Sequence, residues 1–216
     1  MKRIRRLCAI KIGAREEIRV YCGEIPPDES HRRQHFEALE LLSAVCEKYD
    51  GEKNLRIRRD ENGKPQLIHP TLHMNLAHCK GLVVCAVGYR AVGVDAEFPR
   101  PIRDSLISRI CSPTEASAIS AAKQKDLMFS RLWTLKEAYG KWEGGGIRLP
   151  LSELSFSLSE DSIVFDHPDQ DNVSFFQLML TETENSNLPA AVSVCCGKIG
   201  QPFRIESPYD VIASRP

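Results

Sequence analysis

The sequence lacks an excess of charge of either sign. Its 29 lysines and arginines balance its 29 aspartates and glutamates across 216 residues. A chain without net charge has no overall attraction to nucleic acid or to an anionic membrane, so we expect neither as a partner. Its 42% of hydrophobic and 27% of charged residues are typical of a globular protein long enough for one large domain or two small ones.

Long apolar runs are also missing. The basic N-terminus has only the apolar stretch Leu7–Ile10 before Lys11 interrupts it. That stretch is shorter than the apolar segment of a signal peptide, and no later run is long enough to span a bilayer. We therefore expect a cytoplasmic protein whose N-terminus forms a β-strand.

No two of the eight cysteines have the C-x-x-C spacing of a zinc or redox motif. Most lie in apolar stretches, which together with the missing secretion signal favours free, buried thiols over disulfides. The stretch 69–79 holds three histidines and a cysteine, but their spacing fits no zinc pattern. The cysteines are Cys8, Cys22, Cys46, Cys79, Cys85, Cys111, Cys195 and Cys196.

The sequence contains no phosphate-binding loop of the form G-x-x-x-x-G-K-[ST]. Mg²⁺-dependent nucleotide hydrolases and kinases commonly use such a loop to hold phosphates. The run Gly144–Gly146 follows a predicted helix instead of opening one. These enzyme classes are therefore disfavoured.

Helical periodicity is clearest in two segments. Residues 28–49 form the first, and its initial turn holds the basic run His31-Arg32-Arg33, which opposes the helix dipole. Solvation of these charges would explain them, but an anionic ligand would remove the conflict. The second helix covers 126–143. The apolar stripes are Phe36, Leu39, Leu42, Val45 and Cys46 in the first, and Met128, Leu132, Leu135, Tyr139 and Trp142 in the second.

The rest of the chain predicts an α+β fold with mostly antiparallel pairing. Ser112-Pro113-Thr114-Glu115 has the form of a capping box that starts a further helix. Asn62-Gly63 predicts a turn, and Pro99 and Pro101 predict a boundary near residue 98, which divides the chain into 1–98 and 99–216. The predicted strands are 82–88, 92–97, 151–158, 173–181 and 190–196.

Asp95 and Glu97 lie in the sequence GVDAE of the second predicted strand. Residues two apart in a strand point to the same face, so the two carboxylates should lie side by side. Like charges this close repel unless water or a cation separates them. A solvated strand face is the simpler reading, and a cation site is the alternative.

Glu137 and Lys141 are spaced as an i, i+4 pair on the second helix, which is common on solvent-exposed helices. Together with Asp95 and Glu97, however, Glu137 completes a set of oxygen donors that suits Mg²⁺ and a bound phosphate. Cations that could then meet a polyphosphate are Arg33, Lys64, Lys136 and Lys141.

Two motifs together resemble the 4′-phosphopantetheinyl transferase superfamily. They are GVDAE and the later W-T-L-K-E-A-Y-G-K that begins at Trp133. The resemblance spans roughly residues 30–196, and the length is similar to that of the Sfp-type members. It implies a monomer with two similar halves in a pseudo-twofold arrangement, in contrast to the short trimeric members. Flanking segments that share it are Gly63-Lys64-Pro65, residues 74–78, 112–115 and 144–156.

The resemblance implies transfer of 4′-phosphopantetheine from coenzyme A to a serine of an apo acyl or peptidyl carrier protein, with release of adenosine 3′,5′-bisphosphate. It implies Mg²⁺ held by Asp95, Glu97 and Glu137. Glu137 would act as general base, directly or through water, and Lys141 would contact the same phosphates. A non-catalytic module that binds carrier proteins is the alternative, but decay of an enzyme should first remove these carboxylates.

The resemblance also implies the contacts to coenzyme A, with His78 and Arg33 near its 3′-phosphate. One departure is Ala77, which stands where the family pattern N-x-S-H has a serine. The region 99–130 would receive the carrier, with arginines Arg100, Arg103 and Arg109 near apolar residues Ile102, Leu106, Ile107 and Ile110. The implied coenzyme A contacts are Arg33, Arg59, Lys64, Asn75, His78, Asp95 and Lys141.

Overall fold

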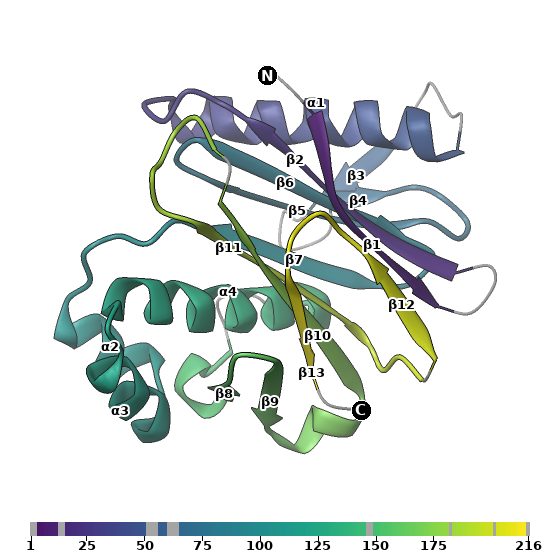
Figure 1. The fold of residues 1–216 in the computed structure, drawn as a ribbon. Helices are drawn as coiled ribbons and strands as arrows, with labels where there is room; N and C mark the ends of the chain where they lie inside the picture. The colour runs from purple at the N-terminus through teal and green to yellow at the C-terminus, as the bar shows by residue number, and fades with distance from the viewer. Residues whose placement is uncertain are drawn as a thin grey trace.

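The computed structural model describes residues 4–12, 16–50, 56–59, 65–145, 149–181, 183–200 and 202–214, with backbone only for 48–50. Two large sheets stack face to face, and a long helix covers the outer face of each (Figure 1). The prediction of an α+β fold with mostly antiparallel sheets is confirmed. In the described residues, no helix combines the length and the apolar composition that a bilayer crossing requires.

The first sheet has five strands in the order β12-β1-β2-β6-β5, all antiparallel. Successive side chains of its strands point to opposite faces, and both faces carry apolar residues. One face therefore packs on the second sheet and the other on helix α1 (His31–Asp50). A small hairpin of β3 (Ile57–Arg59) and β4 (Pro65–Leu67) stands apart from it. The strands are β12 (Phe203–Glu206), β1 (Ile4–Ile12), β2 (Glu16–Glu24), β6 (Leu82–Gly88) and β5 (His73–Cys79).

Helix α1 confirms the first predicted helix, and the Ser30 hydroxyl accepts a hydrogen bond from Arg33 N–H at its start. The predicted apolar stripe was wrong at Phe36, which is 49% exposed. Leu42, Val45 and Cys46 are buried as predicted, and Ala38 and Leu41 join them on the buried face. The Phe36 ring lies under the Arg33 guanidinium, 5.2 Å from ring centre to carbon.

The second sheet has six strands in the order β7-β11-β10-β13-β9-β8. Its pairs are antiparallel except β13 with β9, which run parallel. The predicted strand 151–158 is shorter than expected because 151–153 form the 3₁₀ turn η2. A second such turn, η3, covers Pro168–Asp171. The strands are β7 (Val92–Glu97), β11 (Ala190–Gly197), β10 (Val173–Leu180), β13 (Val211–Ser214), β9 (Ser162–Asp166) and β8 (Ser155–Leu158).

Apolar side chains from both sheets fill the space between them, among them Val20, Val84, Val94 and Val192. Residue 98 does not separate the two sheets: β7 precedes it but joins the second sheet, and β12 follows it but joins the first. The division of the chain at residue 98 stays a prediction, as does the pseudo-twofold relation of its halves.

Helix α4 (Lys125–Glu143) confirms the second predicted helix and packs on β7, β11 and β10. It ends where Gly144 adopts a left-handed φ of 98°, which glycine tolerates. Two shorter helices, α2 (Asp104–Ile110) and α3 (Pro113–Ala121), lie beside it. The predicted capping box is confirmed, because Ser112 and Glu115 exchange hydrogen bonds of 3.3 and 2.8 Å.

Lys136 on α4 is fully buried and is surrounded by four oxygens. Its ammonium lies 2.7 Å from Glu115 Oε2, and the carbonyls of Ile110, Leu151 and Leu154 lie 3.0, 2.7 and 2.5 Å away. The second oxygen of Glu115 accepts from Phe156 N–H at 2.9 Å. This ion pair therefore ties α4 to α2, α3 and the start of β8.

Removing one partner of this pair should destabilise the protein strongly. Lys136→Met leaves Glu115 buried and unpaired, so the free energy of unfolding in urea should fall by about 3–5 kcal/mol. The double variant with Glu115→Gln should recover part of that loss. Lys123→Met, at an exposed site, is the control and should change stability by less than about 0.5 kcal/mol. Equal, small effects of Lys136→Met and the control would contradict the role of the buried pair.

Candidate functional site

The backbones of β7 and α4 touch at Gly93. A Cβ built on Gly93 would lie 2.0 Å from the carbonyl oxygen of Ala138 and 2.6 Å from the amide nitrogen of Trp142. Only a residue without a side chain allows this approach. The contact brings Asp95, two residues further along β7, next to Lys141 on α4.

Lys141 reaches from the helix to the strand with its ammonium group. Its Nζ donates to Asp95 Oδ1 at 2.7 Å and to the carbonyl oxygen of Val94 at 3.0 Å. The aspartate side chain is 11% exposed and the lysine side chain 25%. This half-buried ion pair links the two elements that carry the predicted acidic residues.

Three carboxylates influence one another at this contact. Burial raises the pKa of Asp95, and the Lys141 ammonium opposes that rise. Burial also raises the pKa of Glu97, where Arg100 opposes the rise and the Asp95 charge adds to it. Burial raises the pKa of Glu137 as well, with the Asp95 charge adding and Lys141 opposing. The charge of Asp95 therefore acts on both Glu97 and Glu137, and we refer to these three carboxylates as the acidic cluster.

The chemistry of this acidic cluster fits a hard divalent cation. Repelling, partly buried carboxylates are stabilised when a cation lies between them. Among the described residues, however, no group of three or more histidine, cysteine, aspartate or glutamate side chains is arranged so that it could hold a metal ion. Mg²⁺ normally takes only one or two carboxylates and fills its other positions with water and substrate phosphates, so an incomplete set suits it.

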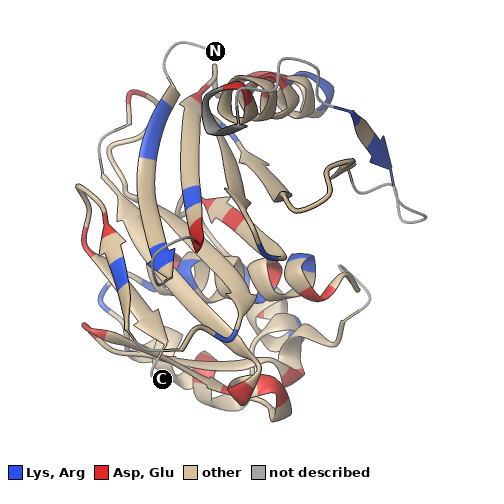
Figure 2. Ribbon diagram, turned by 90° about the vertical axis from the view of Figure 1, so that its right-hand side faces the viewer, with Lys and Arg blue, Asp and Glu red and all other residues tan. Residues whose placement is uncertain are grey.

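A basic cluster adjoins the acidic one. The ring of His78 on β5 lies 4.7 Å from that of His31 and 6.2 Å from that of His35, both on α1. The guanidinium of Arg59 lies 2.8 Å from His35 Nε2. Figure 2 shows acidic and basic positions meeting between α1, at the top, and the helices below.

His78 is the member of the basic cluster closest to the acidic cluster. Burial lowers its pKa to about 4, helped by the charges of His31, Lys141 and His35. His78 is therefore neutral near pH 7 and offers an N–H donor without a charge. His31 was predicted only as part of the basic run at the start of the first helix, and His35 was not predicted, although their four-residue spacing on one helix places them on one face.

The other predicted contacts differ in where the structure places them. Arg33 lies on the exposed side of α1, where it pairs with Glu37 at 2.6 Å. Asn75 is buried and its Oδ1 accepts from Val94 N–H at 3.1 Å. Ala77 is buried in the core between the sheets. Lys64, like the predicted turn at Asn62-Gly63, lies outside the described residues.

The expectation that Lys136 meets a phosphate was wrong. Lys136 and Glu137 are neighbours in sequence and therefore point about 100° apart around the helix. The ammonium of Lys136 is fully buried against Glu115, on the side of α4 away from β7. All eight cysteines are free and buried, as predicted. Burial raises the pKa of the Cys79 thiol, and the charges of Glu97 and Asp95 add to that rise.

A groove of about 560 Å³ lies at the start of α2. Three of the arginines and two of the apolar residues predicted to meet a carrier line it, whereas Ile110 packs into the core. The charge of Arg100 acts on Glu97, so the groove adjoins the acidic cluster. The lining residues are Arg100, Pro101, Ile102, Arg103, Ser105, Leu106 and Arg109.

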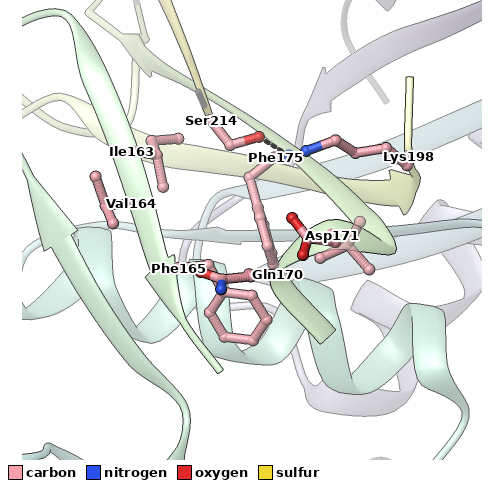
Figure 3. Close-up of a pocket in the computed structure, with 9 residues that line it drawn as sticks. Ile163, Val164, Phe165, Gln170, Asp171, Phe175, Lys198 and Ser214 are labelled. Carbon is pink, nitrogen blue, oxygen red and sulfur yellow. Dashed lines mark hydrogen bonds between the residues drawn. The ribbon is translucent and has the colours of Figure 1, made fainter. Parts of the chain in front are cut away.

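A separate pocket of about 240 Å³ opens between β9, β10 and β13 (Figure 3). Its walls include Phe165 and Phe175, and Asp171 and Lys198 lie at its rim. No residue of the acidic or basic cluster lines it. None of the described residues predicted to act in catalysis or binding lines this pocket, and Asp95 and Lys141 meet at the β7–α4 contact instead.

Comparison with known proteins gives a consistent result. A family model described as the 4′-phosphopantetheinyl transferase superfamily matches residues 91–192, which include the acidic cluster and the groove. A 4′-phosphopantetheinyl transferase of Bacillus subtilis is 30% identical over 164 residues, which are 74% of this chain and 71% of that protein.

Two further relatives match over a shorter part. The 4′-phosphopantetheinyl transferase Sfp of Bacillus subtilis strain 168 is 34% identical over 63% of this chain and 62% of its own length. The 4′-phosphopantetheinyl transferase HetI of Nostoc sp. is 35% identical over 60% of this chain and 59% of its own length. The match thus spans less than two thirds of these two relatives. On the family match, the identity across most of the chain and the acidic cluster at the β7–α4 contact, the chain belongs to the 4′-phosphopantetheinyl transferase superfamily.

Proposed function

We propose that the protein transfers the 4′-phosphopantetheine group of coenzyme A to a serine hydroxyl of an apo acyl or peptidyl carrier protein and releases adenosine 3′,5′-bisphosphate. The observation that carries the proposal is the meeting of Asp95, Glu97, Glu137 and Lys141 at the β7–α4 contact. Membership of the 4′-phosphopantetheinyl transferase superfamily is the reason to relate this arrangement to phosphopantetheine transfer.

Asp95, Glu97 and Glu137 would hold Mg²⁺ beside the pyrophosphate of coenzyme A. When bound, the ion would neutralise the charge that develops on the leaving phosphate oxygen. The protein's own contribution is to fix these carboxylates on a strand and a helix whose backbones touch. Such rigid placement favours in-line attack, because the reacting groups need no further ordering.

Glu137 is the residue best suited to accept the serine proton, directly or through a water that it holds. Its raised pKa makes it a better base than an exposed glutamate. As the proton leaves, the serine oxygen bonds to the phosphorus that carries pantetheine. The bond from that phosphorus to the bridging oxygen breaks, and adenosine 3′,5′-bisphosphate keeps this oxygen.

The basic cluster would bind the phosphates of coenzyme A. Lys141 lies where it can donate to the pyrophosphate while it stays near Asp95. Neutral His78 would donate one ring N–H to the 3′-phosphate, with the Arg59 guanidinium behind His35 adding positive charge. Arg33, near the start of α1, would attract the same phosphate from the solvent side.

The groove at the start of α2 would receive the carrier protein. Carrier proteins are usually acidic, and three arginines line this groove beside the apolar side chains of Ile102 and Leu106. Opposite charges steer association, while apolar contacts hold the complex. The nearness of Arg100 to Glu97 would place the serine of a bound carrier close to the acidic cluster.

Incubation with apo carrier protein, coenzyme A and Mg²⁺ tests the activity directly. Mass spectrometry should show the carrier gaining the mass of phosphopantetheine, and excess EDTA should stop the gain. Asp95→Ala should lower the rate by about 10²–10³-fold, because an electrostatic group at the reacting centre is lost.

The matched control is Asp166→Ala, an exposed aspartate on β9, which should keep the wild-type rate. Wild-type turnover of Asp95→Ala at limiting Mg²⁺ would refute the role of Asp95. Carrier binding without any transfer by the wild type would instead indicate a non-catalytic module.

The contact of His78 with the 3′-phosphate can be isolated with dephospho-coenzyme A, which lacks that group. The wild type should prefer coenzyme A, and His78→Ala should lose most of this preference through a higher KM for coenzyme A. His73→Ala, an exposed histidine on the same strand, is the control. A His78→Ala variant that discriminates as well as wild type would place the 3′-phosphate elsewhere.

Charge reversal tests the groove. Arg100→Glu combined with Arg103→Glu should raise the KM for the carrier by about tenfold or more at low salt, and added salt should shrink the difference. The KM for coenzyme A should stay near its wild-type value. The matched control reverses Lys80 and Arg204, two exposed cations on other elements. Equal changes in both KM values, or no change at low ionic strength, would place the carrier elsewhere.

A further inference from the structure

Strand β7, which carries Asp95 and Glu97, is the last strand of its sheet and, within the part of the chain that the structure describes, pairs only with β11. One edge of its backbone therefore has no neighbouring strand in that sheet. The N–H and C=O of one residue in a strand point to the same side, and successive residues alternate. In β7 Val94 turns both groups to the open edge, while Asp95 turns its own toward Ser193 on β11.

Two side chains satisfy Val94 at this open edge. Its N–H donates to Asn75 Oδ1 at 3.1 Å, and its C=O accepts from Lys141 Nζ at 3.0 Å. One of these hydrogen bonds comes from a side chain of the first sheet and the other from a side chain of α4. Together they take the place of the missing neighbouring strand at the residue next to Asp95.

The side-chain oxygen of Asn75 is placed to fix the strand. Asn75 is only 3% exposed, and its Oδ1 is committed to Val94. It belongs to β5, which is itself the edge of the first sheet. Its side chain thus joins the edges of the two sheets at one point. Losing a buried hydrogen-bond partner leaves the other group unsatisfied, which favours loosening of the strand.

We propose that Asn75 is a positioning residue that anchors the open edge of β7 and through it orients Asp95 and Lys141. Coenzyme A does not touch Asn75 in this assignment. The effect on catalysis rests on the function proposed above. The anchoring of the strand does not, so the two can fail separately.

Hydrogen exchange of single amides, followed by NMR on the full chain, tests the anchoring without any substrate. In the wild type the Val94 amide should be protected although it faces an open edge. Asn75→Leu should speed its exchange at least tenfold, while the Asp95 amide, which faces β11, should stay protected. Asn75→Asp keeps an acceptor oxygen in place and should keep most of the protection.

Kinetics with Mg²⁺ and coenzyme A then test the consequence for the site. Asn75→Leu should lower kcat by about 10–100-fold, as loss of a supporting hydrogen bond typically does, and should raise the Mg²⁺ concentration needed for half-maximal rate. The KM for coenzyme A should change by less than about twofold, because no ground-state contact is removed. Asn75→Asp should restore part of kcat.

The matched control is Asn185→Leu, which removes amide hydrogen bonds to the carbonyls of Ile25 and Gly81, away from β7. It should leave Val94 exchange and kcat unchanged.

Fast Val94 exchange in the wild type, or equal exchange in wild type and Asn75→Leu, would overturn the anchoring. A raised KM for coenzyme A with unchanged kcat would make Asn75 a substrate contact and overturn the proposal. Faster Val94 exchange in a protein that transfers nothing would support the anchoring and defeat only the proposed function.

Discussion

The orientation of α4 depends on the buried ion pair between Lys136 and Glu115. Lys136 can be buried only if its ammonium finds oxygens, and Glu115 together with three carbonyls supplies them. Because these oxygens all lie on one side of α4, the helix has a single favourable rotation about its axis. That rotation turns Glu137 and Lys141 toward β7. A structural pair on one side of the helix thus sets the chemistry on the other.

Positively and negatively charged side chains lie close together at the site. Lys141 faces Asp95, Arg100 acts on Glu97, and Arg59 contacts His35 beside the rings of His31 and His78. Such a surface binds neither a bare cation nor a bare anion as well as it would bind both together. A polyphosphate that carries its own divalent cation presents both charges at once, which suits the function proposed for this family member.

Local pattern predicted the elements that carry the site but not all of its partners. The bounds of β6 and β7 and the capping box at Ser112 followed from residues within one element. The burial of Lys136 depends on Glu115, 21 residues earlier, and nothing in the W-T-L-K-E sequence shows which lysine turns inward. Strand β12 is only four residues long and pairs with β1 at the other end of the chain, so it has no local signal.

Gly93 fixes the distance between β7 and α4, the two elements that carry the site. Main-chain atoms of β7 and α4 are in contact there. The spacing between Asp95 and the helix is therefore set by this main-chain contact and not by the packing of side chains. Side chains around the site can change its charge without changing that spacing. The groove at the start of α2 is instead lined by residues of α2 and of the segment before it, among them three arginines. Substitutions in the groove can therefore change its charge and shape while the spacing between β7 and α4 stays constant.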